Sequence, residues 1–182
     1  MTMSPTVRKA ALTVHVTTSV GWLGAVAAFL ALAVVGLVGS DGPTVRGAYL
    51  AAAVVTWFVI VPLCLASLLT GIVQSLGTTW GLIRHYWVVV KLALTVGATL
   101  LLFVHTQPID HLAATASDAR EFGDDLHGMR VQLAVDAGLA IVVLLVTTAL
   151  STVKPLGQTR YWQRRVRGSA AVNSYARPPS TP

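Results

Sequence analysis

Four long apolar tracts dominate the sequence, and they constrain the fold more than any other feature. They cover about residues 10–39, 48–76, 86–106 and 131–153, and the first two carry no formal charge. A helix rises about 1.5 Å per residue, so each tract is long enough to cross a hydrocarbon core of about 30 Å. Only 11% of the residues are charged, against about 25% in soluble domains. The sequence therefore predicts an all-α protein, a four-helix transmembrane bundle, and excludes a soluble globule.

Prolines and polar stretches indicate where the tracts end. Pro62 lies inside the second tract and should kink its helix rather than end it. Pro108 should end the third helix, which leaves an outer loop over residues 107–130. The first tract is longer than the apolar region of a signal peptide, so we interpret it as an uncleaved helix; cleavage near residues 31–33 is the alternative. The chain then divides into an N-terminal segment, a membrane domain and a basic, largely disordered tail: 1–9, 10–156 and 157–182.

The distribution of Lys and Arg predicts the topology. Nine of them lie in the N-terminal segment, the second connection and the tail, whereas the other two connections hold only Arg46, Arg120 and Arg130. By the positive-inside rule, both termini should be cytoplasmic. The basic tail suits anionic lipids of the inner leaflet. Because the net charge of +6 sits at the chain ends and not on an amphipathic surface, nucleic-acid binding is not expected.

Polar side chains inside the tracts recur at helical spacing, so each helix carries one polar stripe. The stripes are His15, Thr18, Trp22 and Phe29; Thr56, Leu63, Ser67, Thr70 and Gln74; Trp87, Lys91, Ala98 and His105; and Gln132, Asp136, Val143 and Thr147. A polar group that faces lipid is costly, so we expect the stripes to turn toward one another. Their depths predict that His15 can meet Lys91 near the cytoplasmic side, and that His105 can meet Asp136 near the outer side.

These residue types are suited to binding a cofactor or to transferring protons. A neutral imidazole is a good axial ligand of haem, and a deprotonated lysine amine can be the opposite ligand. Proton relay by His15, Lys91 or Asp136 is equally consistent with their burial, and His105 with Asp136 is a candidate metal or proton site. Structural roles stay open beside these. Lys91 can snorkel to the headgroups, His15 can bond a helix backbone, and Asp136 can bond another helix or pair with Arg130.

Two motifs resemble those of a known superfamily. The segment His15-Val-Thr-Thr-Ser-Val-Gly-Trp22-Leu-Gly24 resembles the first-helix signature of the copper-resistance-D-like superfamily of bacterial membrane proteins. Trp87-Val-Val-Val-Lys91-Leu is similar to its later W-x-x-x-K-L helix. The superfamily includes haem-biosynthetic protoporphyrinogen oxidases, which bind haem b through a first-helix histidine and use a helix lysine. The nearest likeness, over Leu12 to Thr106, is to an uncharacterised family of predicted integral membrane proteins of high-GC bacteria.

The resemblance implies a multi-pass protein of the bacterial inner membrane that binds haem b. His15 and Lys91 would be the functional pair, with Trp22 and Trp87 beside them. The oxidases carry Arg and His soon after the signature, and residues 31–39 contain neither, so protoporphyrinogen oxidation is not expected.

Three hypotheses on function follow from the sequence. The first is an integral membrane protein that binds haem b or a similar redox cofactor inside the bundle. The second is a non-catalytic partner or scaffold subunit that packs with a second copy or with another membrane protein. The third is a component of a small metal or proton transporter. The sequence leaves open whether any reaction is catalysed.

Overall fold

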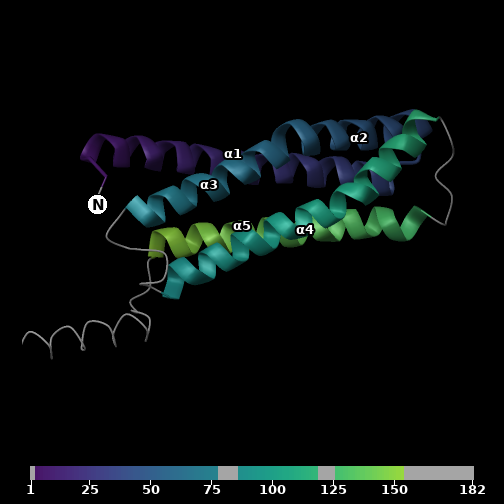
Figure 1. Cartoon of the computed structure of the whole chain (residues 1–182). Coiled ribbons are helices and arrows are strands. Elements are labelled where there is room, and N and C mark those ends of the chain that lie inside the picture. The colour runs from purple at the N-terminus through teal and green to yellow at the C-terminus, as the bar shows by residue number, and fades with distance from the viewer. Residues whose placement is uncertain (1–2, 78–85, 119–125, 154–182) are drawn as a thin grey trace, which may run out of the picture.

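The protein is a bundle of long helices, seen in a computed structural model that describes residues 3–77, 86–118 and 126–153 (Figure 1). The elements are α1 (Pro5–Val38), α2 (Gly42–Val55), a π-helical turn η1 (Thr56–Ile60), α3 (Val61–Gly77), α4 (Tyr86–Ser117) and α5 (His127–Val153). Within those ranges there is no strand. Four stretches are long and apolar enough to cross a membrane: Pro5–Val38, Gly42–Gly77, Val88–Ser117 and His127–Thr152. The predicted all-α, four-helix membrane bundle is confirmed.

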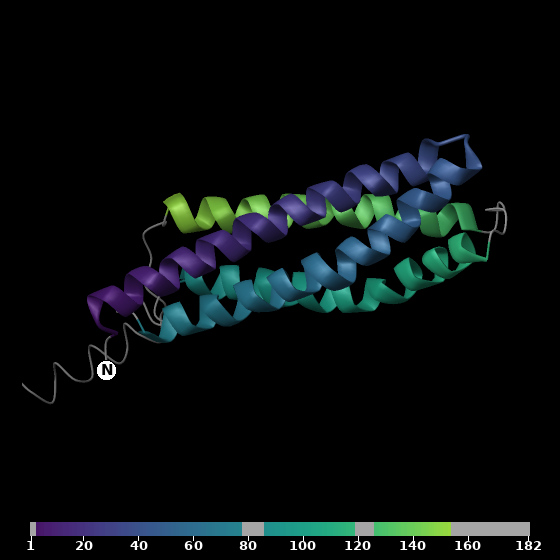
Figure 2. The ribbon, with the colours of Figure 1, turned by 90° about the horizontal axis from the view of Figure 1, so that it is seen from above.

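Successive spans run in opposite directions and close into a ring. The α1 span packs against α3 and α5, while α4 packs against α2, α3 and α5. Figures 1 and 2 show that the start of α1 and the end of α5 lie at the same end of the bundle. An even number of spans places these two ends on one side of the membrane. That this side is cytoplasmic stays a prediction of the positive-inside rule.

Side chains sort between a packed interior and an apolar coat. The interior holds Trp22, Val26 and Phe29 of α1, Tyr49 of α2 and Leu112 of α4, together with the buried polar residues His15, Thr56, Ser67, Thr99, Thr106 and Thr147. The large exposed side chains are apolar, for example Val20, Leu69, Leu100 and Val104. This arrangement is expected of a bundle solvated by lipid, where polar groups face neighbouring helices. Of the predicted stripes, the polar residues His15, Thr56, Ser67 and Thr147 are buried, whereas Gln132 is exposed.

The second span stays continuous through Pro62 because its helix widens just before that residue. At η1 the backbone N–H of Val61 donates to the carbonyl of Thr56, five residues earlier. Thr56, which is fully buried, also donates its hydroxyl to the Ala52 carbonyl at 2.8 Å. A wide turn of this kind accommodates the backbone hydrogen bond that is missing at Pro62, because proline has no N–H group to donate. The prediction that Pro62 does not end the helix holds.

The third span does not end at Pro108, contrary to the sequence prediction. Helix α4 runs through this proline to Ser117, and α5 begins at His127, so much of the predicted loop 107–130 is helical. The extension buries Ile109, Leu112 and Ala116 in the core. A helical proline loses one backbone hydrogen bond, and tertiary packing offsets that loss here.

Candidate functional site

His15 of α1 and Lys91 of α4 meet inside the bundle, as their depth predicted. The Nε2 atom of His15 lies 3.3 Å from Nζ of Lys91. Lys91 also donates to the Ser151 hydroxyl of α5 at 2.7 Å. On the other side of the ring, His15 Nδ1 lies 3.0 Å from the Thr70 hydroxyl of α3. The cluster thus joins helices from all four spans.

The hydrogen bonds around His15 place a proton on its Nδ1 atom. The Thr70 hydroxyl donates its only proton to the Ala66 carbonyl at 2.6 Å, so its oxygen accepts from His15 Nδ1–H. Nε2 faces Nζ of Lys91 at 3.3 Å, and a hydrogen bond between these nitrogens needs a lone pair on one of them. His15 and Lys91 therefore do not both carry a full positive charge while this hydrogen bond is made. Neither group snorkels to the surface, because each has its partner within the bundle.

Gly71 of α3 lets the imidazole ring lie close to the helix backbone. A Cβ atom on Gly71 would stand 3.2 Å from Cε1 of His15, which is closer than ordinary van der Waals contact. One turn deeper, the hydroxyls of Ser19 and Ser67 lie 2.7 Å apart. The polar face between α1 and α3 is therefore tightly packed.

A haem group does not fit between His15 and Lys91 as they lie. Two metal–nitrogen bonds of about 2 Å each would hold the axial nitrogens about 4 Å apart with the porphyrin between them. The 3.3 Å contact of these nitrogens is shorter, and neither residue lines the cavity described below. Haem binding stays a prediction that requires the pair to open.

The resemblance also named Trp22 and Trp87 beside this pair. Trp22 lies in the core, whereas the side chain of Trp87 lies outside the described part of the chain.

The second predicted pair, His105 of α4 and Asp136 of α5, also meets. Its Nε2 and Oδ2 atoms lie 2.7 Å apart, and the Gln132 amide nitrogen lies 3.2 Å from the same Nε2. His105 Nδ1 faces the Leu101 carbonyl at 2.8 Å, and since a carbonyl only accepts, Nδ1 carries a proton. The contact between Nε2 and Oδ2 is short but poorly aligned, and in the described part of the chain Oδ2 has no hydrogen-bond partner.

Arg130 is not the partner of Asp136, which was one alternative from the sequence. Its Nε donates to the Tyr49 hydroxyl at 3.1 Å, and its terminal nitrogen donates to the Gly36 and Leu37 carbonyls. These carbonyls end α1, where a cation interacts favourably with the helix dipole. Arg130 therefore fastens α5 to the α1–α2 hairpin.

Metal binding at His105 and Asp136 stays a prediction. Metal sites in proteins commonly have three or more protein ligands. Across residues 3–77, 86–118 and 126–153, no group of three His, Cys, Asp or Glu side chains could hold an ion.

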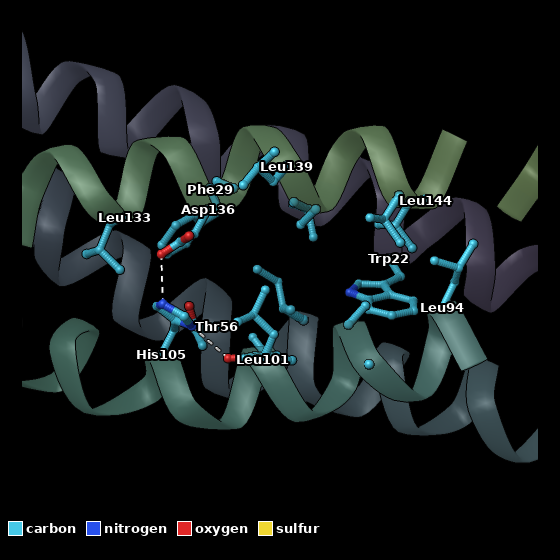
Figure 3. Close-up of a pocket in the computed structure, with 18 of the residues that line it drawn as sticks. Trp22, Phe29, Thr56, Leu94, Leu101, His105, Leu133, Asp136, Leu139 and Leu144 are labelled. Atoms are coloured by element: carbon cyan, nitrogen blue, oxygen red, sulfur yellow. Dashed lines mark hydrogen bonds and ion pairs between the residues drawn. The ribbon is translucent and has the colours of Figure 1, made fainter. Parts of the chain in front are cut away.

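A cavity of about 280 Å³ lies between α1, η1, α4 and α5 (Figure 3). Most of its wall is aliphatic, with His105 and Asp136 at one end and Trp22, Leu94 and Leu144 at the other. Ala93, Gly97, Leu101 and Leu139 border it and are exposed on the outside of the bundle. The cavity therefore reaches the lipid-facing surface between α4 and α5.

Trp22 presents an unused donor to this cavity. The residue is only 4% exposed, and Figure 3 shows its indole nitrogen turned toward the middle of the space. None of the described residues accepts a hydrogen bond from it. A bound molecule with an acceptor atom could receive a hydrogen bond from this N–H group.

Sequence reasoning missed two members of the first cluster and the cavity itself. Ser151 lies four residues after Thr147, and Ser19 four after His15, so extending each stripe by one turn would have found them. No periodicity predicts an empty volume, because the volume depends on how the side chains of all four spans pack against one another.

No protein-family model matches the chain, and neither a curated protein nor a solved structure is significantly similar to it. The fold and the two polar pairs define the class, a multi-pass integral membrane protein with four spans. The resemblance to the copper-resistance-D-like superfamily stays a prediction.

Proposed function

We propose that this integral membrane protein binds a bilayer-dissolved molecule inside the bundle, in the cavity between α1, α4 and α5. The observation that carries the proposal is the form of the cavity. It is apolar along its length, polar at the His105–Asp136 end, and bordered by exposed residues of α4 and α5. Ligand sites in proteins are commonly apolar pockets with a few convergent polar groups.

The cost of an empty cavity supports an occupant. Protein interiors rarely hold voids larger than a water molecule. This space opens to the lipid-facing surface between α4 and α5, so molecules of the bilayer can enter it. Water does not fill apolar cavities well, so a guest from the bilayer is favoured.

The size of the cavity limits the guest. A volume of about 280 Å³ corresponds to roughly nine water molecules at about 30 Å³ each, or on the order of ten non-hydrogen atoms. It is too small for a whole porphyrin. A small amphiphile, or one end of a longer one, matches it.

Photolabelling in liposomes tests the proposal. The probe is decanol that carries a photoactivatable diazirine, and the labelled peptides are mapped by mass spectrometry. We expect labels on the lining segments, residues 93–102 of α4 and 133–144 of α5. Gly97→Leu should fill the entrance, since nothing lies within 4 Å of a Cβ at Gly97, and should reduce labelling by about tenfold, which corresponds to about 1.4 kcal/mol.

Gly138→Leu is the matched control. It makes the same helical substitution into open space, at a position outside the cavity wall, so it should leave the labelling unchanged. Labelling spread over the lipid-facing surface, with equal yield in both variants, would refute a binding cavity.

Haem b binding by His15 and Lys91 is a second candidate, because both residues of the resemblance belong to one polar cluster inside the bundle. It requires Lys91 to lose a proton and the two nitrogens to move apart. Freshly extracted protein should then show a Soret band that His15→Ala removes and that His111→Ala, at an exposed histidine, retains. A colourless protein would remove this candidate.

The other two hypotheses from the sequence have their own tests. Co-purification with another membrane subunit would favour the scaffold hypothesis. Substrate flux in proteoliposomes that Lys91→Ala abolishes would favour a transporter.

A further inference from the structure

We infer that the guest of the cavity is an uncharged amphiphile whose head carries a hydroxyl group, held at the His105–Asp136 end. The inference rests on the proposed function, because it names the chemical class of the guest. It is carried by the charges and hydrogen-bonding groups that line the cavity. No residue involved is needed for the separate cluster around His15.

The cavity offers a charged guest no unpaired counter-ion. Among the described residues that line it, only His105 and Asp136 are ionisable. These two side chains lie against each other, with Nε2 and Oδ2 2.7 Å apart.

A charged head would therefore meet no compensating group. An ion in hydrocarbon is costly unless it is paired, and His105 and Asp136 are already in contact with each other. An anionic head finds no free Lys or Arg among the lining residues, and a cationic head has to displace the imidazole from Asp136. A neutral head avoids both costs.

The carboxyl group of Asp136 favours a donor on that neutral head. Its Oδ2 atom is buried, and because its short contact with His105 Nε2 is poorly aligned, it receives no hydrogen bond within the described ranges. The oxygen therefore keeps unused capacity as an acceptor. A hydroxyl group can donate to this oxygen. A carbonyl or ether head could not, because it has no proton to give.

Competition for the photolabelled cavity tests the inference on the unaltered protein. Decanol, decane, decanoate and decylammonium are compared at equal concentration in the bilayer. Decanol should displace the probe about tenfold more effectively than decane, because only decanol can donate a hydrogen bond to Asp136. Decanoate and decylammonium should be weaker competitors than decanol.

Asp136→Leu should remove the preference for decanol over decane. Asp110→Leu is the control, because Asp110 lies on the outside of α4 and accepts from Trp57 Nε1 at 2.8 Å; it should keep the preference. Labelled cavity peptides with decane, decanoate or decylammonium as the best competitor would overturn the inference and leave the binding function standing. Absence of labelled cavity peptides would instead overturn the proposed function.

Discussion

At the scale of single residues, Gly71 determines how His15 sits. The glycine leaves just enough room for the imidazole ring, and a Cβ there would stand 3.2 Å from Cε1. Since Nδ1 and Nε2 of this ring bind Thr70 and Lys91, a shift of the ring would disturb both contacts. A small residue in α3 thus sets the geometry of a site built from four spans.

Gly71→Ala should for this reason be less stable than Gly24→Ala, by about 1 to 2 kcal/mol. Alanine gains up to about 1 kcal/mol in helix propensity at both positions, and only the first substitution overpacks its surroundings. Gly24 has nothing within 4 Å of its added Cβ. Unfolding in detergent measures the difference, and equal stability of the two variants would contradict the close packing of His15.

Contacts of this kind were only partly predictable. Helical periodicity and depth identified His15, Lys91, His105 and Asp136, because an ionisable group inside a membrane has to face the interior of the bundle. The hydroxyl partner Ser151 and the tautomer of His15 depend on the rotation and axial register of α3, α4 and α5. Sequence spacing within one helix does not fix these relations between helices.

At the scale of the elements, α4 shows how packing overrides a local signal. Pro108 predicted an end, yet the helix continues, and Leu112 on the far side of the proline is fully buried. The prediction failed because it considered only the backbone hydrogen bond lost at Pro108. It could not include the burial of Ile109 and Leu112 in the core.

Leu112→Ala should therefore destabilise the protein by about 2 to 5 kcal/mol, the range for large cavities in a core. Leu100→Ala should be close to neutral, because Leu100 is 62% exposed on the face that meets lipid. Denaturation in mixed micelles compares the two. A negligible cost at Leu112 would show that the segment after Pro108 is not part of the packed bundle.

The N-cap residue of α2 gives the stability of the protein a pH dependence. Asp41 accepts from the hydroxyl and the backbone N–H of Thr44, at 2.6 and 3.0 Å, and these hydrogen bonds hold its pKa below the usual value. The carboxylate therefore stabilises the helix start above its ordinary pKa, and this contribution is lost as the pH falls through the lowered pKa. Thermal unfolding of Asp41→Asn should be less sensitive to acid than that of the unaltered protein; the same acid sensitivity in both would contradict the role of this cap.

At the scale of the whole molecule, composition and tract length predicted the architecture well. Four spans, an apolar coat and inward polar stripes all follow from the cost of polar groups in a bilayer. The orientation of the bundle follows only from the distribution of basic residues, several of which lie outside the described ranges. The cavity could not be predicted, because it arises where small residues such as Gly97 and Ala98 face α1 and α5.

Thiol labelling checks the orientation. In a Cys64→Ala background, an impermeant maleimide added to intact cells should label Asp41→Cys in the short connection after α1. It should label Ser4→Cys, next to the start of α1, only after lysis. The opposite pattern would place both described ends outside the cell and would leave the four spans unchanged.

The central claim is that inward-turned polar groups enclose a site for a small uncharged guest from the membrane. Native mass spectrometry of protein released directly from membranes tests it most directly. We predict one bound neutral molecule per chain, lost in Gly97→Leu and kept in Gly138→Leu. A chain that carries no such molecule, or one whose bound molecule survives Gly97→Leu, would contradict the account.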